Sequence, residues 1–321
     1  MTGAGGFIGS HLVERLTDLG AKVRAFVRYT SRANIGWLSS LSPQMLSKIH
    51  IVRGDLKDAS AVKAAVSDME IVFHLGALIG IPYSYVAPRE TAETNLMGTL
   101  NVLMAIREVP SVERLIHTST SEVYGTAQVV PMDEKHPLCA QSPYSATKIG
   151  ADKLVESFYS SFALPSVILR PFNTFGPRQS ARAVIPAIVT QALKGNEILL
   201  GSTTPIRDLT YVSDTVDGFV KAAQTPGIEG RTINLGSGVG VSIEEVVEKV
   251  GTCLGKRLTI HSDEARLRPA KSEVERLISN FEIAKNLLHW SPQVSLDSGL
   301  KMTIEWISKN LHLYKIGAYE V

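Results

Sequence analysis

The chain has 321 residues, enough for two domains or for one large α/β unit with a smaller lobe. Hydrophobic residues make up 44% and charged residues 20%, a globular composition that excludes a disordered or fibrous protein. The 33 basic and 31 acidic residues leave a formal charge of +2, too balanced to predict a nucleic-acid partner. The two cysteines, Cys139 and Cys253, exclude a disulfide framework and a cysteine-based zinc site.

Nothing in the sequence predicts a membrane segment or a metal site. No apolar run reaches the roughly 18 residues that a membrane-spanning helix needs. The N-terminus has neither the basic start nor the apolar core of a signal peptide. With so few cysteines, this favours a soluble, cytoplasmic protein that binds neither membranes nor nucleic acids. The histidines are scattered along the chain, so we expect no metal.

Glycines stand at positions 3, 6 and 9, and a helical pattern of apolar residues from Leu12 to Leu19 follows them. Such glycines let the backbone turn tightly, approach a pyrophosphate closely and pack a helix against a sheet. The helix N-terminus adds amide donors and a positive dipole. Gly3 to Gly9 therefore predict a turn that holds a dinucleotide, although an ordinary glycine-rich turn can have the same pattern.

The strand that precedes such a turn is missing, because only Met1 stands before Thr2. About five buried aliphatic residues would contribute on the order of 8–15 kcal/mol, comparable to the stability of a whole domain. We therefore expect that this strand was lost from the sequence as given, for example through a misplaced start codon. The alternative is a sheet that is gapped or repaired at this position.

Short apolar strands alternate with helical patterns along the chain. The expected strands are 22–27, 49–52, 71–75, 114–118, 166–170, 209–212 and 232–235. The expected helices are 59–66, 95–109, 144–162, 184–194, 243–254, 281–288 and 298–310. This alternation predicts an α/β protein with a Rossmann-type doubly wound parallel sheet and a smaller C-terminal α/β lobe. Ligands of such a sheet bind at the C-terminal ends of its strands.

Tyr144 and Lys148 form the most informative short motif, because residues four apart share one helix face at ~6 Å. The Lys148 ammonium would lower the pKa of the Tyr144 phenol from about 10 and make a phenolate base accessible. Such a base can remove a hydroxyl proton while a hydride leaves the same carbon. With the glycine turn and the strand end at Thr118, the pair predicts a hydride-transfer site.

At this point the sequence closely resembles the extended short-chain dehydrogenase/reductase family, in particular its nucleotide-sugar epimerases and 4,6-dehydratases. The resemblance covers nearly the whole chain. It is carried by Asn95 and by segments 2–9, 54–56, 74–77, 118–125, 144–148, 170–178, 207–208 and 268–269. It implies a nicotinamide cofactor and a nucleoside-diphosphate sugar as substrate. We place the dinucleotide-binding domain at 1–172 and about 209–235, and the nucleotide-sugar-binding lobe at 173–208 and 236–321.

The resemblance also implies roles for individual residues. Tyr144 would be the base, Lys148 would also hold the nicotinamide ribose, and Thr120 would hydrogen-bond the sugar near O4. The other residues implied at the cofactor are Gly3, Gly6, Phe7, Ile8, Gly9, Asp55, Leu56, Leu75, Ala77, Asn95 and Thr118. The candidates at the substrate are Tyr83, Ser84, Asn173, Arg178, Arg207 and Arg268. Of these, Arg207 and Arg268 best suit the diphosphate, whereas Tyr83 and Ser84 fit ordinary loop packing equally well.

Glu122 favours a dehydratase over an epimerase. The family's dehydratases carry an acidic residue at this position, whereas typical 4-epimerases look different there. Glu122 would remove the C5 proton and return it, directly or through Ser121 or water, to the departing C6 hydroxyl. We therefore expect a 4,6-dehydratase that forms a 4-keto-6-deoxy sugar. The alternatives are a 4-epimerase and a non-catalytic NADP-binding regulator of the same fold.

The pair Ser121-Glu122 resembles GDP-mannose dehydratases and the dehydratases of bacterial nonulosonic-acid pathways, which favours an N-acetylhexosamine nucleotide as substrate. The cofactor is expected to be NADP, with NAD as the alternative. The end of the second strand, around Arg28 and Arg32, carries no carboxylate for a ribose 2′-hydroxyl, and guanidinium groups suit a 2′-phosphate. Arg28 stacked on adenine, or facing solvent, is the competing interpretation.

A homodimer is also implied by the resemblance, through helices 95–109 and 144–162. Leu154, Phe158 and Phe162 form an apolar stripe that suits either dimerisation or sheet packing. The sequence does not choose between the two.

Overall fold

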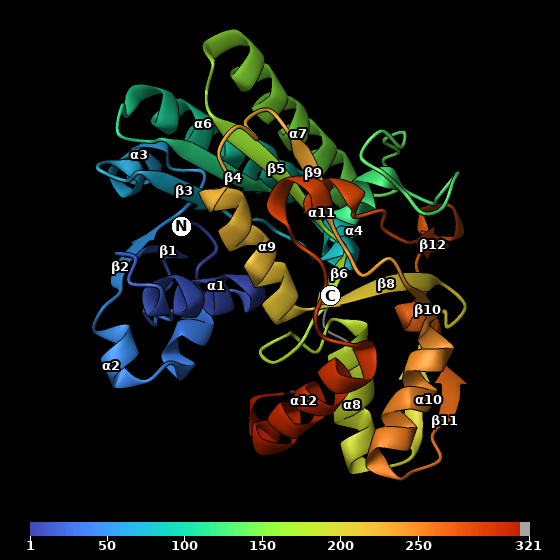
Figure 1. Cartoon of the computed structure of the whole chain (residues 1–321). Helices are drawn as coiled ribbons and strands as arrows, with labels where there is room; N and C mark the ends of the chain where they lie inside the picture. The colour runs from blue at the N-terminus through green and yellow to red at the C-terminus, as the bar shows by residue number, and fades with distance from the viewer. Residues whose placement is uncertain (315–321) are drawn as a thin grey trace.

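A parallel sheet organises the N-terminal half of the chain in the computed structural model, which describes residues 1–314 (Figure 1). Its strands are β1 (Arg24–Arg28), β2 (His50–Gly54), β3 (Ile71–His74), β4 (Arg114–Thr118), β5 (Ser166–Pro171) and β9 (Thr232–Leu235). The parallel pairs are β1 with β2, β3 with β4, β4 with β5, and β5 with β9. The predicted Rossmann-type fold is confirmed.

The two halves of this sheet meet at the first residues of the chain. Thr2 forms parallel bridges to Phe26 of β1 and to His74 of β3. The Phe26 amide donates to the Met1 carbonyl at 2.8 Å, and the Thr2 amide donates to the Phe73 carbonyl at 2.9 Å. Residues 1 and 2 thus lie where the first strand of the sheet was expected.

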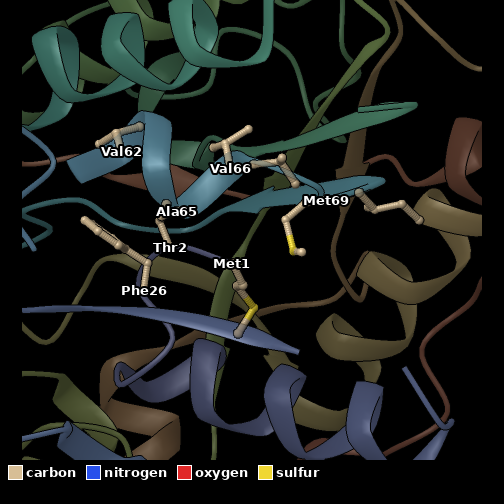
Figure 2. A pocket seen from close by; sticks show the side chains of 9 residues that line it. Met1, Thr2, Phe26, Val62, Ala65, Val66 and Met69 are labelled. Atoms are coloured by element: carbon tan, nitrogen blue, oxygen red, sulfur yellow. The ribbon is translucent and has the colours of Figure 1, made fainter. Parts of the chain in front are cut away.

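A small pocket lies beside this joint, close to α3 (Ala59–Val66) (Figure 2). Its walls come from Met1, Thr2, Phe26, Val62, Ala65, Val66, Met69, Ile71 and Val72. The volume of about 10 Å³ has room for about one water molecule. Because the pocket is this small and its walls are mostly apolar, it is not a candidate for the functional site.

Helices cover both faces of the sheet. On one face, α3 packs on α6 (Gly98–Glu108), which packs on α7 (Pro143–Phe162). On the other, α1 (Phe7–Asp18) packs on α9 (Val212–Gln224), as Figure 1 shows. Phe158 is buried, and Leu154 packs against the same core cluster, so these two members of the apolar stripe serve packing. Phe162 is half exposed.

A second group of strands and helices forms the C-terminal lobe, at the lower right of Figure 1. Strand β8 (Ile206–Tyr211) pairs with β6 (Asn173–Phe175), β10 (Gly240–Ser242) and β12 (Arg276–Leu277). Strand β7 (Glu197–Leu200) pairs with β11 (Thr259–Ser262). Its helices are α8 (Val184–Lys194), α10 (Ile243–Leu254) and α12 (Leu296–Lys309), whereas α11 (Glu282–Leu288) packs on β9 and α9. Residues 209–211, assigned above to the dinucleotide-binding domain, therefore belong to a different sheet from β9.

Some local predictions differ from the structure. The expected helix 95–109 is a π-helical turn, Glu93–Met97, followed by α6. The expected loop at 79–85 is largely helical, because Pro82 and Pro88 start α4 (Ile81–Val86) and α5 (Pro88–Ala92) in positions that suit proline. Residues 315–321 of the predicted substrate lobe lie outside the described residues. Over residues 1–314, no helix has the length and apolarity needed to cross a membrane.

The structure adds short elements that the sequence patterns did not predict. They are η1 (Gly36–Ser40), α2 (Pro43–Leu46), η3 (Ser121–Tyr124), η4 (Glu264–Arg266), η5 (Ala270–Ser272) and η6 (Leu311–Leu313). Of these, η3 positions side chains of the candidate site. It starts immediately after the Thr118–Thr120 segment at the end of β4.

Candidate active site

The N-terminal glycines pack the first turn against the end of β3. Gly3 has φ +66°, and a Cβ on it would lie 2.7 Å from the Gly76 nitrogen and from the carbonyl carbon of Leu75. A Cβ on Gly9 would lie 2.1 Å from the Gly3 carbonyl oxygen. Helix α1 begins at Phe7 with no side-chain cap, so its first amides remain available to an anion. This turn suits the pyrophosphate of a dinucleotide.

A cavity of about 360 Å³ lies beside this turn, at the C-terminal ends of β1 and β3. It is lined by Arg28, Ala77, Leu78, Ile79, Gly80, Tyr83 and Arg182. The volume is that of a small-molecule site. Arg28, Ala77 and Tyr83 were predicted from the sequence, but Arg182 was not. Arg182 stands two residues before α8 in a segment without a recognisable motif.

Glu90 engages two of the predicted residues at this cavity. Its carboxylate accepts a hydrogen bond from the Tyr83 hydroxyl at 2.5 Å, and this bond raises the pKa of Tyr83. The other Glu90 oxygen lies 3.6 Å from Nη2 of Arg28. Arg28 therefore has a carboxylate partner that its own strand does not supply. Arg32 is exposed.

Three of the predicted cofactor residues, Asn95, Asp55 and Leu56, make contacts within the fold. Asn95 accepts from the Leu78 amide at 2.7 Å and donates to the Leu78 carbonyl at 2.9 Å and to Thr147 Oγ1 at 3.0 Å. Because both ends of its amide are engaged, Asn95 fixes the loop after β3 to α7 rather than facing a ligand. Asp55 accepts from the Lys57 amide, and Leu56 is buried.

The predicted catalytic pair lies on the first turns of α7. Ser142 and Ser145 form a capping box that starts this helix. Tyr144 and Lys148 are buried, with 6% and 4% of their surfaces exposed. The Tyr144 phenol hydrogen-bonds with Thr120, and Lys148 Nζ donates to the Thr118 carbonyl at 2.7 Å. The structure thus brings Thr118, Thr120, Tyr144 and Lys148 together.

The electrostatics of this pair differ from the prediction. Burial raises the pKa of Tyr144 above its usual value, and Lys148 does not offset this. Burial also lowers the pKa of Lys148 to about 8. The expectation that Lys148 lowers the phenol pKa is therefore wrong for the protein alone. The physical reason is that desolvation of the phenolate outweighs an ammonium whose hydrogen bond goes to Thr118.

Glu122 lies within electrostatic range of both Tyr144 and Arg207. Its amide donates to Thr120 Oγ1 at 3.2 Å at the start of η3. Burial is the main cause of the raised pKa of Tyr144, and the Glu122 carboxylate is a further cause. Burial lowers the pKa of Arg207, and the Glu122 carboxylate opposes this. Ser121 beside it is buried. The carboxylate of Glu122 is therefore within electrostatic range of the Tyr144 phenol and of the Arg207 guanidinium.

Arg207 and Arg268 converge on one carboxylate, that of Glu273. Arg207 Nη2 lies 3.1 Å and Arg268 Nη1 lies 3.7 Å from the same Glu273 oxygen. The predicted pair is therefore brought together, by a glutamate that no sequence motif had indicated. Two guanidinium groups held this close suit a diphosphate.

Arg178 and Ser84 do not join these groups. Arg178 donates to Glu14 at 2.8 Å and to Ser10 at 3.4 Å, so it is tied to α1. Ser84 has no exposed surface, and its hydroxyl donates to the Ile81 carbonyl at 2.7 Å. Their predicted substrate contacts find no support, because their polar atoms already have partners within the fold.

Other polar atoms at the site are buried without a hydrogen-bond partner among residues 1–314. They include Oγ1 of Thr118, Nδ2 of Asn173 and Nη1 of Arg268. Native proteins satisfy most buried polar atoms, so these atoms point to a polar ligand. In the same described part of the chain, no three histidine, cysteine or carboxylate side chains are grouped to hold a metal.

The family follows from a match along almost the whole chain. A family model described as GDP-mannose 4,6 dehydratase matches residues 1–303. The chain belongs to this family. A relative named UDP-glucose 4-epimerase from Mycolicibacterium smegmatis is 32% identical over 314 residues, covering 95% of this chain and 97% of the relative. The family thus contains nucleotide-sugar epimerases as well as dehydratases, and the predicted resemblance is confirmed.

Two solved structures support the same conclusion. UDP-glucuronic acid 4-epimerase from Bacillus cereus, with NAD and UDP-glucuronic acid, has a TM-score of 0.87 and 29% identity, covering 96% of this chain and 98% of that one. A dTDP-glucose 4,6-dehydratase from Streptomyces venezuelae, with NAD bound, has a TM-score of 0.85 and 26% identity, covering 98% of each chain. Both neighbours bind NAD, and they catalyse different reactions.

Proposed function

We propose that this protein is a nucleotide-sugar 4,6-dehydratase. The observation that carries the proposal is the position of Glu122, which lies within electrostatic range of both Tyr144 and Arg207. A dehydratase needs a carboxylate in addition to the base that initiates oxidation at C4. The fold and the family support the first half of the reaction, which dehydratases and epimerases share.

The first step takes a proton from the C4 hydroxyl, and Tyr144 is the base proposed for it. Thr120 holds the phenol oxygen by a hydrogen bond, so the two hydroxyls can bind the same sugar oxygen. A bound oxidised nicotinamide would accept the hydride from C4 and return it to C6, and its positive charge would favour the phenolate of Tyr144. Lys148, whose pKa is about 8, supplies a second positive charge near neutral pH.

The second step removes water across C5 and C6, and Glu122 is proposed to carry the proton. Once C4 is a ketone the C5 hydrogen is acidic, so the Glu122 carboxylate can remove it. The same proton then leaves with the C6 hydroxyl as water, directly from Glu122 or through Ser121. When the hydride is added at C6, C5 takes up a proton from solvent, which completes the 4-keto-6-deoxy sugar. Arg207 and Arg268 are proposed to hold the diphosphate, which keeps the sugar in place during both steps.

A 4-epimerase is the second candidate, and the comparisons favour it as strongly. The relative from Mycolicibacterium smegmatis is named as an epimerase. In this reaction the 4-keto sugar rotates within the site, and the hydride returns to the opposite face of C4. Glu122 would then have no chemical role, which is why the position of its carboxylate favours the dehydratase.

The cofactor is proposed to be NADP, with NAD as the alternative. Arg28 and Arg182 line the same cavity, and two guanidinium groups suit a 2′-phosphate. Glu90 pairs with Arg28 and would repel that phosphate, and the solved neighbours hold NAD. Calorimetric titration with each dinucleotide decides between them. Tighter binding of NADP that is lost in Arg28→Ala supports the proposal, and tighter binding of NAD contradicts it.

The experiment that tests the function is a product analysis. Incubation with UDP-, GDP-, CDP- and dTDP-hexoses, including N-acetylhexosamine nucleotides, is followed by mass spectrometry and NMR. We expect one substrate to lose a water molecule and form a 4-keto-6-deoxy sugar, and Tyr144→Phe to abolish this. A product of unchanged mass with an inverted C4 identifies an epimerase. Binding of the dinucleotide without turnover of any sugar identifies a regulator.

A further inference from the structure

A buried carboxylate lies directly behind the proposed catalytic pair. Asp152 is fully buried and stands one helical turn after Lys148 on α7. Residues four apart share one face of a helix, so Tyr144, Lys148 and Asp152 follow one another along the same face. Neither the motifs nor the proposed function gives Asp152 a role.

One oxygen of Asp152 is fully engaged. Oδ2 accepts from Ser119 Oγ at 2.8 Å and from Nε and Nη2 of Arg170 at 3.2 and 2.9 Å. The other oxygen, Oδ1, lies 3.4 Å from Nε2 of the buried His117. Ser119, Arg170 and His117 therefore hold the carboxylate in place, one helical turn from Lys148.

The charges that face this site come from every element packed against it. Arg170 of β5 balances the carboxylate of Asp152. Burial lowers the pKa of His74 and of His117, so both rings are neutral near pH 7. Burial raises the pKa of Tyr124 in η3 to about 12 and raises that of Tyr144, so both phenols are neutral as well.

Lys148 is a buried cation on the same helix, and its ammonium donates a hydrogen bond to the neutral Thr118 carbonyl. Burial lowers its pKa to about 8, and Asp152 is the group that opposes this. Burial also raises the pKa of Asp152, but His117 and Arg170 outweigh it and keep the carboxylate charged. Without Asp152, the buried Lys148 ammonium would lose the carboxylate that opposes the effect of burial, and a lysine, unlike an arginine, can release its proton.

We propose that Asp152 is a positioning residue that keeps the Lys148 ammonium charged in the active site near neutral pH. The proposal rests on the proposed function in one respect, namely that Lys148 acts beside Tyr144 in the reaction. Asp152 acts through Lys148 and does not touch the sugar.

The test measures the charge of Lys148 directly, without substrate or cofactor. The full chain is labelled with ¹³C-lysine, and the Cε signal of Lys148, identified by its loss in Lys148→Met, is followed against pH by NMR. In the wild type we expect a midpoint near pH 8. In Asp152→Asn the midpoint should fall by at least about one unit.

A second variant separates this role from simple pairing with Arg170. Asp152→Asn alone leaves the Arg170 charge buried without its partner, which can unfold the protein. Asp152→Asn/Arg170→Met removes both charges together and keeps the site filled. The proposal expects the Lys148 midpoint to stay low in this double variant. If the Lys148 midpoint of the double variant equals that of the wild type, the proposal is overturned. The role of Asp152 would then be only to pair with Arg170.

The activity of the same variants provides an independent readout. Once a substrate is known, the alkaline limb of kcat should move to lower pH in step with the NMR midpoint, and KM should change little. If the wild type turns over no nucleotide sugar, the proposed function fails while the NMR result still decides the role of Asp152. A shifted midpoint with an unmoved pH profile contradicts the proposal that this charge serves the reaction.

Discussion

Glu122 is the residue on which the choice between the two candidate reactions depends. Glu122→Gln keeps the size of the side chain and removes its ability to accept the C5 proton. We expect this variant to oxidise the sugar slowly at C4 but to exchange no deuterium into C5 from heavy water, as measured by NMR. Glu134→Gln, a control at a carboxylate that bonds the Asn234 amide, should keep the exchange. Full dehydratase activity in Glu122→Gln would reject the assignment.

His11 should make stability depend on pH. Burial and the Arg178 charge lower the pKa of this ring to about 4, and its Nε2 donates to the Pro177 carbonyl. Because protonation is disfavoured in the folded state, stability present at pH 7 is lost as the pH falls through 6.5 toward 4. We expect His11 to account for a loss of about 2 kcal/mol between pH 7 and pH 5.

Urea unfolding at both pH values checks this effect. His11→Gln should have a smaller pH dependence than the wild type, whereas the exposed His50→Gln should keep the wild-type dependence. Equal pH dependence in all three proteins would show that His11 is not buried as a neutral ring. The comparison is made between variants because His74 and His117 are also buried.

At the residue scale, the sequence allowed the local part of the site to be predicted. Tyr144, Lys148, Thr120 and Glu122 stand in short motifs, so their neighbourhood follows from one strand end and one helix. Glu273, Arg182 and Asp152 were missed. Glu273 meets Arg207, and Arg182 reaches the cavity of Arg28 and Tyr83, across long separations in the chain. A single acidic residue four positions after a lysine is also common on solvated helices.

At the scale of elements, the first turn of α1 should tolerate no side chain at Gly9. A Cβ at Gly9 would overlap the Gly3 carbonyl oxygen at 2.1 Å, so the backbone would have to shift. Gly9→Ala should therefore weaken dinucleotide binding at least tenfold in calorimetry and lower the unfolding midpoint. Gly195→Ala is the matched control, since nothing lies within 4 Å of its Cβ position. Equal binding by both variants would exclude this turn from the cofactor site.

The elements themselves were predictable where the apolar pattern was long. Strand 114–118 and helices 59–66, 184–194 and 243–254 agree with β4, α3, α8 and α10. The strands β10 and β12 escaped prediction because segments of two or three residues have no measurable alternation. Helix α4 escaped because its six residues include Pro82 and two tyrosines, a composition that is equally typical of a loop.

At the scale of the whole molecule, the expected homodimer remains a prediction. Met97, Tyr159 and Phe162 leave 48%, 39% and 50% of their surfaces exposed around α7. Exposed apolar side chains of this size suit an interface, which needs about 800 Å² from each partner. Sedimentation should find a dimer for the wild type and a monomer for Met97→Glu. Val239→Glu, at an exposed apolar residue of the other lobe, should stay dimeric. A wild-type monomer would contradict the expectation.

Contacts between segments that are far apart in the chain could not be predicted from the sequence. Arg207 and Glu273 stand in different segments of the C-terminal lobe, and only the folded chain shows that they meet. The same holds for Thr2, which bridges both β1 and β3. The fold class was predictable because it depends on repeated local units. The substrate site depends on contacts between segments, which no local pattern encodes.

The central claim is that a hydride leaves C4 and reaches C6 of the same sugar. A nucleotide sugar deuterated at C4, chosen from the product analysis, tests this most directly when the position of deuterium in the product is determined by NMR. The account predicts deuterium on C6 of a 4-keto-6-deoxy sugar. Deuterium found again on an inverted C4 would contradict it and identify an epimerase.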